Sequence, residues 1–332
     1  MSTKTNPKGR LIIIGGHEEK DNERERPIVE EVAKAAARTK IVVITVATRR
    51  PEELWEDYRK LFKELGVPQV ELLDVRTRED AYEQANVDKL TDGAVVFFTG
   101  GDQLRITSQI GDSLVFRRMR DLFQRGGTIC GTSAGAAAMP ETMLVSGPGD
   151  SSSRLSALDM APGLGLVRGV VVDSHFAERG RMGRLLGAVA QNPKNVGLGI
   201  DEDTAVIVEC GGGEFGESGS LRVLGAGAVY VVDGTRIDYS SLSERKAEGV
   251  LTICNVTLHV LGADDEYDLS SRRPLPNSDE QPAVLRGGRT ANASQERHGS
   301  SRNGKNGRNG KNGKNAKNGK HAKSSNGLAK SA

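Results

Sequence analysis

Residues 128–136 read Thr-Ile-Cys-Gly-Thr-Ser-Ala-Gly-Ala, a short apolar strand followed by a tight turn and by small residues that can begin a helix. The turn carries the pattern Gly-x-Ser-x-Gly. Between a strand and a helix, this pattern places the serine on a strained bend that exposes its hydroxyl at the end of the strand. The sequence therefore predicts that Ser133 is a nucleophile in an α/β protein.

Upstream of this turn, strand patterns alternate with helical patterns. The predicted strands cover Leu11–Ile14, Lys40–Val46, Val70–Val75 and Ala94–Phe98. Apolar stripes predict helices within residues 28–36, 51–65 and 115–123, and a more polar helix is expected over Glu79–Leu90. This alternation predicts a mostly parallel sheet flanked by helices, with the carboxyl ends of the strands, and hence the functional site, along one edge.

Beyond about residue 140, shorter strands and tight turns replace the long helices. The predicted strands are Gly169–Asp173, Val196–Ile200, Val206–Val208, Leu221–Val223, Ala228–Val232 and Leu251–Val260, with a helix over Arg184–Val189. The last four of these strands, which are joined by tight turns, indicate an antiparallel extension of the sheet in the C-terminal part. Residues 1–270 are therefore expected to form a single α/β catalytic domain.

Residues 271–332 lack hydrophobic periodicity and become rich in Asn, Gly and Lys. Residues 301–332 hold nine of the chain's 46 Lys and Arg residues and none of its 44 Asp and Glu residues, so residues 1–300 carry 37 basic against 44 acidic groups. Such a basic tail cannot bury enough apolar surface to offset its ordering entropy, so we expect it to be disordered. The mildly acidic remainder argues against nucleic acid as a partner.

Other features exclude further classes of protein. No apolar run approaches the roughly 18 residues of a membrane span, and Met1–Arg10 has no apolar segment typical of a secretory signal. The widely spaced Cys130, Cys210 and Cys254 fit neither a disulfide framework nor a zinc site. We therefore expect a cytoplasmic protein with no membrane partner, whose chemistry needs no metal and no cofactor.

A serine nucleophile needs a general base, most often a histidine. Of the five histidines, two lie in the basic tail and His259 lies within an apolar strand. His17 and His175 both follow predicted strands and fall near the edge that holds Ser133. We favour His175 because charged residues cluster around it, and the role of His17 stays open.

The base in turn needs a carboxylate that orients it. Glu202 follows the predicted strand Val196–Ile200 and is expected at the same edge of the sheet. Asp150, in a loop rich in glycine and serine, is the alternative. In α/β-hydrolases the acid precedes the histidine in the chain. Glu202 follows His175, so both carboxylates remain open on the residues alone.

Two backbone amides are predicted to stabilise an oxyanion. One belongs to Ala134, which follows the serine, and the other to Gly101, in the segment Thr99–Gln103 that follows a strand. Gln103 is predicted to bind a substrate amide or carboxylate, with helix capping as its ordinary structural role.

Three arginines, Arg179, Arg181 and Arg184, gather near the start of a predicted helix. Cations there oppose the helix dipole. A bound carboxylate would reverse that effect, and arginine binds carboxylates with two parallel hydrogen bonds. We therefore predict that the three arginines recognise substrate carboxylates, and that Asp173 holds a substrate cation.

Five blocks together resemble the cyanophycinase family of serine peptidases, which is related to the aspartyl dipeptidases. The blocks are Ile12–Gly16 with Glu18–Lys20, Phe98–Gln103, Gly131–Ala136, Asp173–Phe176 and Gly199–Glu202. Their order and spacing match the family over about residues 8–265. Relatives often carry a small residue where this chain has His17.

The resemblance implies a flavodoxin-like fold similar to class I glutamine amidotransferases, with serine in place of their cysteine. It implies a triad of Ser133, His175 and Glu202. It also implies cyanophycin as the substrate, a polyaspartate chain with arginine on each β-carboxyl, from whose end the enzyme would release β-Asp-Arg dipeptides. A homodimer is likewise expected from the resemblance.

Two other functions stay open at this stage. An aspartyl or β-aspartyl dipeptidase would use the same groups on a smaller substrate. A granule- or polyanion-binding protein would act instead through the basic tail. A glutamine amidotransferase is disfavoured, because Cys130 lies three residues before Ser133, inside the predicted strand.

Overall fold

The computed structural model describes residues 9–20, 25–146, 158–210, 219–243 and 250–276. The chain divides into two compact units, Met1–Pro282 and Ala283–Ala332, and all described residues belong to the first. Asp150 and the predicted tail from residue 277 onward therefore lie outside the described residues. Within the described ranges, no helix is long and apolar enough to cross a membrane.

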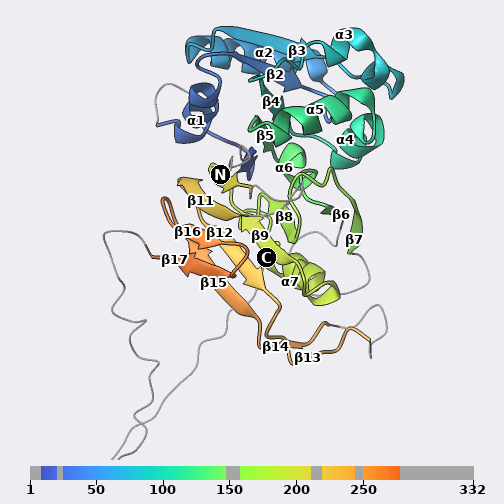
Figure 1. Cartoon of the computed structure of the whole chain (residues 1–332). Helices are drawn as coiled ribbons and strands as arrows, with labels where there is room; N and C mark the ends of the chain where they lie inside the picture. The colour runs from blue at the N-terminus through green and yellow to red at the C-terminus, as the bar shows by residue number, and fades with distance from the viewer. Residues whose placement is uncertain (1–8, 21–24, 147–157, 211–218, 244–249, 277–332) are drawn as a thin grey trace, which may run out of the picture. The chain divides into compact units, whose positions relative to one another are not determined.

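The main sheet has nine strands in the order β17-β16-β11-β10-β1-β5-β4-β2-β3 (Figure 1). Its parallel strands are β1 (Arg10–Ile14), β5 (Thr128–Thr132), β4 (Val95–Phe98), β2 (Lys40–Ile44) and β3 (Gln69–Leu73). β1, β5, β4 and β2 are short and mostly apolar because both of their faces are covered, whereas β3, at the edge of the sheet, is only partly buried. The predicted α/β fold with a mostly parallel sheet is confirmed.

Helices cover both faces of this parallel region. α1 (Pro27–Ala35) and α2 (Pro51–Glu64) pack on one face. α4 (Gln103–Ile110) and α5 (Leu114–Gln124) pack on the other. Successive residues of β1 enter opposite cores, as the alternation of side chains along a strand requires.

The predicted polar helix over Glu79–Leu90 is wrong. The structure has a 3₁₀ turn, η1 (Glu79–Tyr82), and a one-turn helix, α3 (Gln84–Val87). Glu83 between them has an extended backbone, with φ −69° and ψ 128°. Each of the two short helices buries a single side chain, Ala81 in η1 and Asn86 in α3, so there is no apolar stripe to hold a longer helix against the sheet.

The predicted antiparallel extension is present beyond β1. β10 (Thr204–Glu209), β11 (Ser220–Gly225), β16 (Glu266–Asp268) and β17 (Arg273–Leu275) continue the main sheet with antiparallel pairing. Because β17 lies beyond residue 270, the folded part extends past the boundary predicted from the loss of periodicity. A three-residue strand is too short for periodicity to reveal.

Two of the strands that we assigned to this extension belong instead to a second, four-stranded sheet. Its order is β15-β12-β9-β8, formed by β15 (Thr257–Leu261), β12 (Val229–Asp233), β9 (Val196–Ile200) and β8 (Val170–Ser174). β8 and β9 are parallel and are connected through α7 (Met182–Gln191), which packs on β9. Hydrophobic patterns identify strands but not their neighbours, so they could not separate the two sheets.

Two hairpins complete the described part of the chain. β6 (Thr142–Ser146) pairs with β7 (Asp159–Pro162), and neither strand was predicted. β13 (Tyr239–Ser240) pairs with β14 (Ile253–Cys254). The single strand predicted over Leu251–Val260 is therefore divided between β14 and β15, since Asn255 adopts a positive φ of 61° that interrupts extended structure.

Backbone hydrogen bonds to the turn at the end of β1 bring together the end of β5, in the main sheet, and the segments that follow β8 and β9, in the second sheet. The Ser133 amide donates to the Ile14 carbonyl at 3.0 Å, and the His175 amide donates to the Gly15 carbonyl at 2.8 Å. The Asp203 amide donates to the Gly16 carbonyl at 2.9 Å. The ends of β5, β8 and β9 therefore meet at one place, although they come from different sheets.

Candidate active site

Ser133 occupies a strained bend between β5 and α6 (Ala134–Ala137). Its φ is 53° and its ψ is −109°, a conformation that side-chain-bearing residues rarely adopt. The bend is tight because Gly135 lies against β4: a Cβ on Gly135 would come within 2.7 Å of the Phe98 carbonyl oxygen. The strand–turn–helix setting predicted for the serine is therefore present.

Three predicted residues form a continuous chain of hydrogen bonds. Ser133 Oγ lies 2.8 Å from His175 Nε2, and His175 Nδ1 lies 2.6 Å from Glu202 Oε1. The first distance is within the normal range for hydrogen bonds, and the second is slightly shorter, in the direction expected of a bond to a charged carboxylate. This arrangement of nucleophile, imidazole and carboxylate is the one that general-base activation of a hydroxyl requires.

The second sheet, rather than the main one, positions the histidine and the glutamate. His175 follows β8 and is buried, with a positive φ of 49°. A Cβ on Gly16, whose own φ is 109°, would overlap the imidazole ring, so the turn after β1 leaves room for His175 only because it contains glycine there. Our prediction placed His175 at the site through one continuous sheet, and the contact arises instead at the junction of two.

The turn after β9 separates the three neighbouring acids. Both Asp201 oxygens accept backbone hydrogen bonds, from the amides of Ala177 and Ala228. Asp203, at a positive φ of 47°, accepts from the amide of Glu19. These contacts hold Asp201 and Asp203 away from the imidazole, and Glu202 alone of the three is hydrogen-bonded to it.

The environment favours the neutral form of His175. Burial lowers the pKa of His175, its hydrogen bond with Glu202 raises that pKa, and the charges of Arg179 and His17 lower it further. The net shift is downward from the ordinary histidine value. At neutral pH the imidazole is therefore largely unprotonated, which is the state that can accept the serine proton.

The glycine-rich loop after β4 lies beside the serine. A Cβ on Gly100 would be 3.4 Å from Ser133 Cβ. The amides of Gly101 and Ala134 donate no hydrogen bond to any group in the described parts of the chain.

Gln103 uses its amide nitrogen to bind the β6 backbone, at 2.8 Å from the Leu144 carbonyl oxygen. Asp102, rather than Gln103, caps α4.

The structure corrects the role predicted for Asp173. Its side chain is fully buried and both oxygens are occupied: Arg181 Nη1 lies 3.0 Å from Oδ1, and Arg184 Nε lies 2.8 Å from Oδ2. Asp173 is therefore not free to hold a substrate cation. The two guanidinium groups outnumber the one carboxylate, so this buried cluster retains one positive charge. Arg179, by contrast, is exposed.

Glu18 is a further residue of the site, for which the sequence predicted no role. This buried carboxylate accepts a hydrogen bond from Thr132 Oγ1 at 2.6 Å and another from the Tyr58 hydroxyl. Lys20 Nζ lies 3.7 Å from Glu18 Oε1 and stands over the Tyr58 ring. Glu18 therefore fixes the residue that immediately precedes Ser133. The available signal was an acidic residue two positions after the glycine pair that ends an apolar strand.

His17 also lies at the site. Its Nε2 is 3.8 Å from Glu202 Oε1, and its ring centroid is 5.4 Å from that of His175. Its side chain is 72% exposed, in contrast to the buried His175. His17 therefore faces the same carboxylate from the solvent side, without entering the hydrogen-bonded chain.

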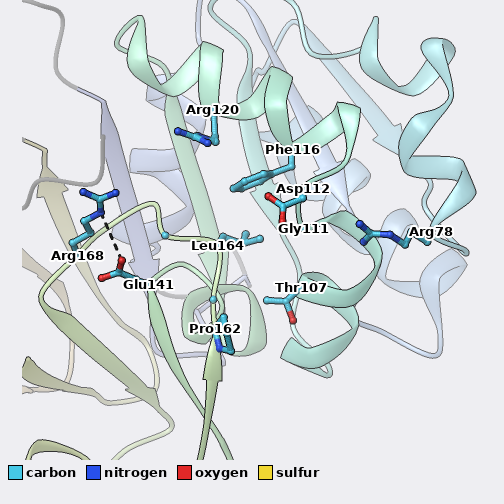
Figure 2. Close-up of a pocket in the computed structure, with 12 residues that line it drawn as sticks. Arg78, Thr107, Gly111, Asp112, Phe116, Arg120, Glu141, Pro162, Leu164 and Arg168 are labelled. Carbon is cyan, nitrogen blue, oxygen red and sulfur yellow. Dashed lines mark ion pairs between the residues drawn. The ribbon is translucent and has the colours of Figure 1, made fainter. Parts of the chain in front are cut away.

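A cavity of about 460 Å³ lies elsewhere, between α4, α5 and the residues that follow β7 (Figure 2). Charged groups at its rim include Arg78, Arg120, Arg168, Asp112 and Glu141. Arg168 Nε is 3.9 Å from Glu141 Oε1. None of the predicted site residues lines this cavity, so it is distinct from the cluster around Ser133.

The fold and the hydrogen-bonded Ser133, His175 and Glu202 define an α/β protein with the site architecture of a serine hydrolase. The chain belongs to peptidase family S51, whose model matches residues 11–214. A protein named cyanophycinase from Nostoc sp. is 38% identical over 278 residues, covering 83% of this chain and 91% of the relative. Another from Geminocystis herdmanii is 36% identical over 271 residues, covering 80% and 95%.

A solved structure supports the fold. A peptidase from an acI-B1 Actinobacterium superposes with a TM-score of 0.57, covering 81% of this chain and all of the other. Its sequence identity is 19%, so the similarity concerns the architecture.

Proposed function

We propose that this peptidase is a cyanophycinase, a serine exopeptidase that hydrolyses cyanophycin to β-Asp-Arg dipeptides. The observation that carries the proposal is the chain of hydrogen bonds from Ser133 through His175 to Glu202, with distances of 2.8 and 2.6 Å. The relatives named cyanophycinase, which match most of this chain, support the choice of substrate.

In the proposed mechanism, His175 Nε2 accepts the proton of Ser133 as Oγ attacks the scissile aspartyl carbonyl carbon. The amides of Gly101 and Ala134 stabilise the oxyanion that forms. His175 then donates its proton to the leaving amine, which departs and leaves an acyl-enzyme. A water molecule, deprotonated by the same imidazole, hydrolyses the ester and restores Ser133.

The charges around the site suit a substrate that carries carboxylates. Arg179 is exposed and lies four residues after His175. The cluster of Arg181, Arg184 and Asp173 adds one net positive charge in the same segment of the chain. In this proposal Arg179 contacts substrate carboxylates directly, while Arg181 and Arg184 act mainly through the buried cluster. Gln103 keeps its carbonyl oxygen for a substrate donor, because its nitrogen is bound to β6.

The decisive experiment is mass spectrometry of the products from purified cyanophycin. We expect β-Asp-Arg from the unchanged protein, none from Ser133→Ala, and unchanged yield from the control Ser108→Ala, an exposed serine on α4. Undiminished cleavage by a correctly folded Ser133→Ala would overturn the proposal. Faster hydrolysis of aspartyl or β-aspartyl dipeptides than of the polymer would identify the chain as a dipeptidase instead.

Two further parts of the proposal come from the resemblance to the family. We propose that the enzyme is a homodimer and that it acts in the cytoplasm. Light scattering of the eluting protein during size-exclusion chromatography tests the first part, and fractionation of the producing cells tests the second.

A further inference from the structure

Three side chains from separate turns converge at the site in a way that the proposed reaction does not use. His17 follows β1, His175 follows β8 and Glu202 follows β9, and each offers a ligand atom within 4.8 Å of the other two. Both histidines have a positive φ, 48° for His17 and 49° for His175. The backbone therefore turns sharply at each of them and directs two imidazoles at one carboxylate.

Two imidazoles and one carboxylate are a typical ligand set for a zinc ion that keeps its fourth position for water. In a tetrahedral site with bonds of about 2.1 Å, neighbouring ligand atoms lie about 3.4 Å apart. His17 Nε2 is 3.8 Å from Glu202 Oε1, close to that spacing. His175 Nδ1 is 2.6 Å from the same oxygen, so this pair would have to separate. The 30% exposure of the Glu202 side chain leaves it room to move.

We propose that His17 Nε2, His175 Nδ1 and Glu202 Oε1 form a binding site for Zn²⁺ and that the bound ion inhibits the enzyme. The inhibition rests on the proposed serine mechanism, whereas the binding does not. The ion is an inhibitor in this proposal, so the expectation that the reaction itself needs no metal is unaffected.

The bound ion inhibits because a neutral imidazole carries one proton, and the ion determines which of the two ring nitrogens carries it. In the free enzyme that proton lies on Nδ1, bonded to Glu202, and Nε2 accepts from Ser133. When the ion occupies Nδ1, the proton moves to Nε2, which then donates to Ser133 Oγ. The imidazole can no longer accept the serine proton, and Glu202 no longer orients it.

His17 distinguishes this site from an ordinary serine–histidine–glutamate arrangement. Without it, an ion would find only two protein ligands, both already engaged with each other. The His17 imidazole adds a third ligand from the exposed side, and it makes no hydrogen bond to other groups in the described ranges. Removing His17 should therefore weaken metal binding while leaving the proposed catalytic groups in place.

The test uses the untagged full-length chain carrying Cys254→Ser, because Cys254 is an exposed free thiol that would bind metal itself. Zn²⁺ binding is measured by calorimetry, and Co²⁺ is followed by the visible absorption of its tetrahedral complex. We expect one site that persists in Ser133→Ala, is weakened about 10–100-fold by His17→Ala, and is unchanged in the control His259→Ala.

Activity provides the second readout. Zn²⁺ should inhibit hydrolysis reversibly, with a chelator restoring the rate, and His17→Ala should need at least tenfold more Zn²⁺ for the same inhibition. Equal Zn²⁺ affinity in His17→Ala and the unchanged chain would overturn the proposal, as would the absence of tetrahedral Co²⁺ absorption. If the chain proves to have no peptidase activity, the binding measurements still decide whether the site exists.

Discussion

At the scale of single residues, the contact between His175 Nδ1 and Glu202 Oε1 determines which nitrogen of the imidazole faces the serine. Donation from Nδ1 to the carboxylate leaves Nε2 as the acceptor, 2.8 Å from Ser133 Oγ. The carboxylate also stabilises the imidazolium that forms when the proton is transferred. Both effects require a negative charge at position 202.

Glu202→Gln should therefore lower kcat strongly with little change in KM. Glutamine keeps the size of the side chain but removes its charge and can present an NH₂ group to Nδ1, which favours the wrong tautomer. We expect a loss of about 10²–10⁴-fold, comparable to the effect of removing this charge in other serine triads. Steady-state kinetics on cyanophycin measure it, with Glu53→Gln, an exposed glutamate on α2, as the control. An unchanged kcat would remove Glu202 from the mechanism.

The lowered pKa of His175 predicts the pH profile of kcat/KM. Activity needs the neutral imidazole, so it should rise with pH through an apparent pKa below the ordinary histidine value of about 6.5. The positive charge of Arg179 is one of the causes that lower the pKa of His175. Arg179→Ala should thus move the acid limb of the profile to higher pH.

The control for this shift is Arg50→Ala, which removes an exposed charge at the start of α2. It should leave the acid limb where it is. A limb that stays in place in Arg179→Ala, or that moves to lower pH, would contradict the assignment of His175 as the titrating base. A lower kcat/KM at all pH values is expected separately from the proposed contact of Arg179 with the substrate.

At the scale of elements, the end of β5 is held by a contact that reaches across the sheet to the turn after β1. Thr132 Oγ1 donates to the buried Glu18 carboxylate, which the Tyr58 hydroxyl of α2 also contacts. The strained Ser133 follows directly. The Glu18 contacts therefore help to offset the cost of that strain, since a bend of this kind persists only where its surroundings fix it.

Two buried threonines at strand ends allow a matched test. Thr132→Val removes a donor from Glu18 and should cost about 1–3 kcal/mol of unfolding free energy. It should also lower kcat, because the serine bend loses a support. Thr45, just after β2, is equally buried, but its hydroxyl has no hydrogen-bond partner in the described part of the chain. Thr45→Val should therefore be neutral or stabilising. Urea unfolding compares them, and equal losses would argue against the Glu18 contact.

Hydrophobic patterns predicted most elements of the parallel region because four of its five strands, β1, β2, β4 and β5, are buried on both faces. They failed where burial is partial or local, as in the short helices η1 and α3 and the hairpin of β6 and β7. The patterns also placed Asp173 and the arginines in one segment. They could not reveal that Asp173 is buried between Arg181 and Arg184, because that depends on how deeply β8 lies in the second sheet.

At the scale of the whole molecule, the candidate site depends on the junction between two sheets. The strand pattern predicted Ser133 and His175 at one edge of a single sheet, and the family resemblance added Glu202. The structure has two sheets, so the proximity of Ser133 and His175 was argued from the wrong connection. The contact depends instead on Gly15 and Gly16, whose carbonyls bind the His175 and Asp203 amides. Pairing between distant segments is set by three-dimensional complementarity, which a local pattern does not encode.

The C-terminal boundary of the folded part gives the last prediction. Arg272 Nη1 lies 2.6 Å from Asp233 Oδ1, so the residues around β17 are tied to β12 of the second sheet. A chain that ends at Ser270 would leave the buried Asp233 carboxylate without this partner and should lose about 3 kcal/mol of unfolding free energy.

A chain that ends at Pro276 keeps Arg272 and β17. We expect it to unfold at the same urea concentration as the full chain and to hydrolyse cyanophycin at the same rate, because residues 277–332 offer few apolar side chains to bury. Loss of hydrolysis in this second truncation, with unfolding unchanged, would show that the basic tail takes part in substrate binding.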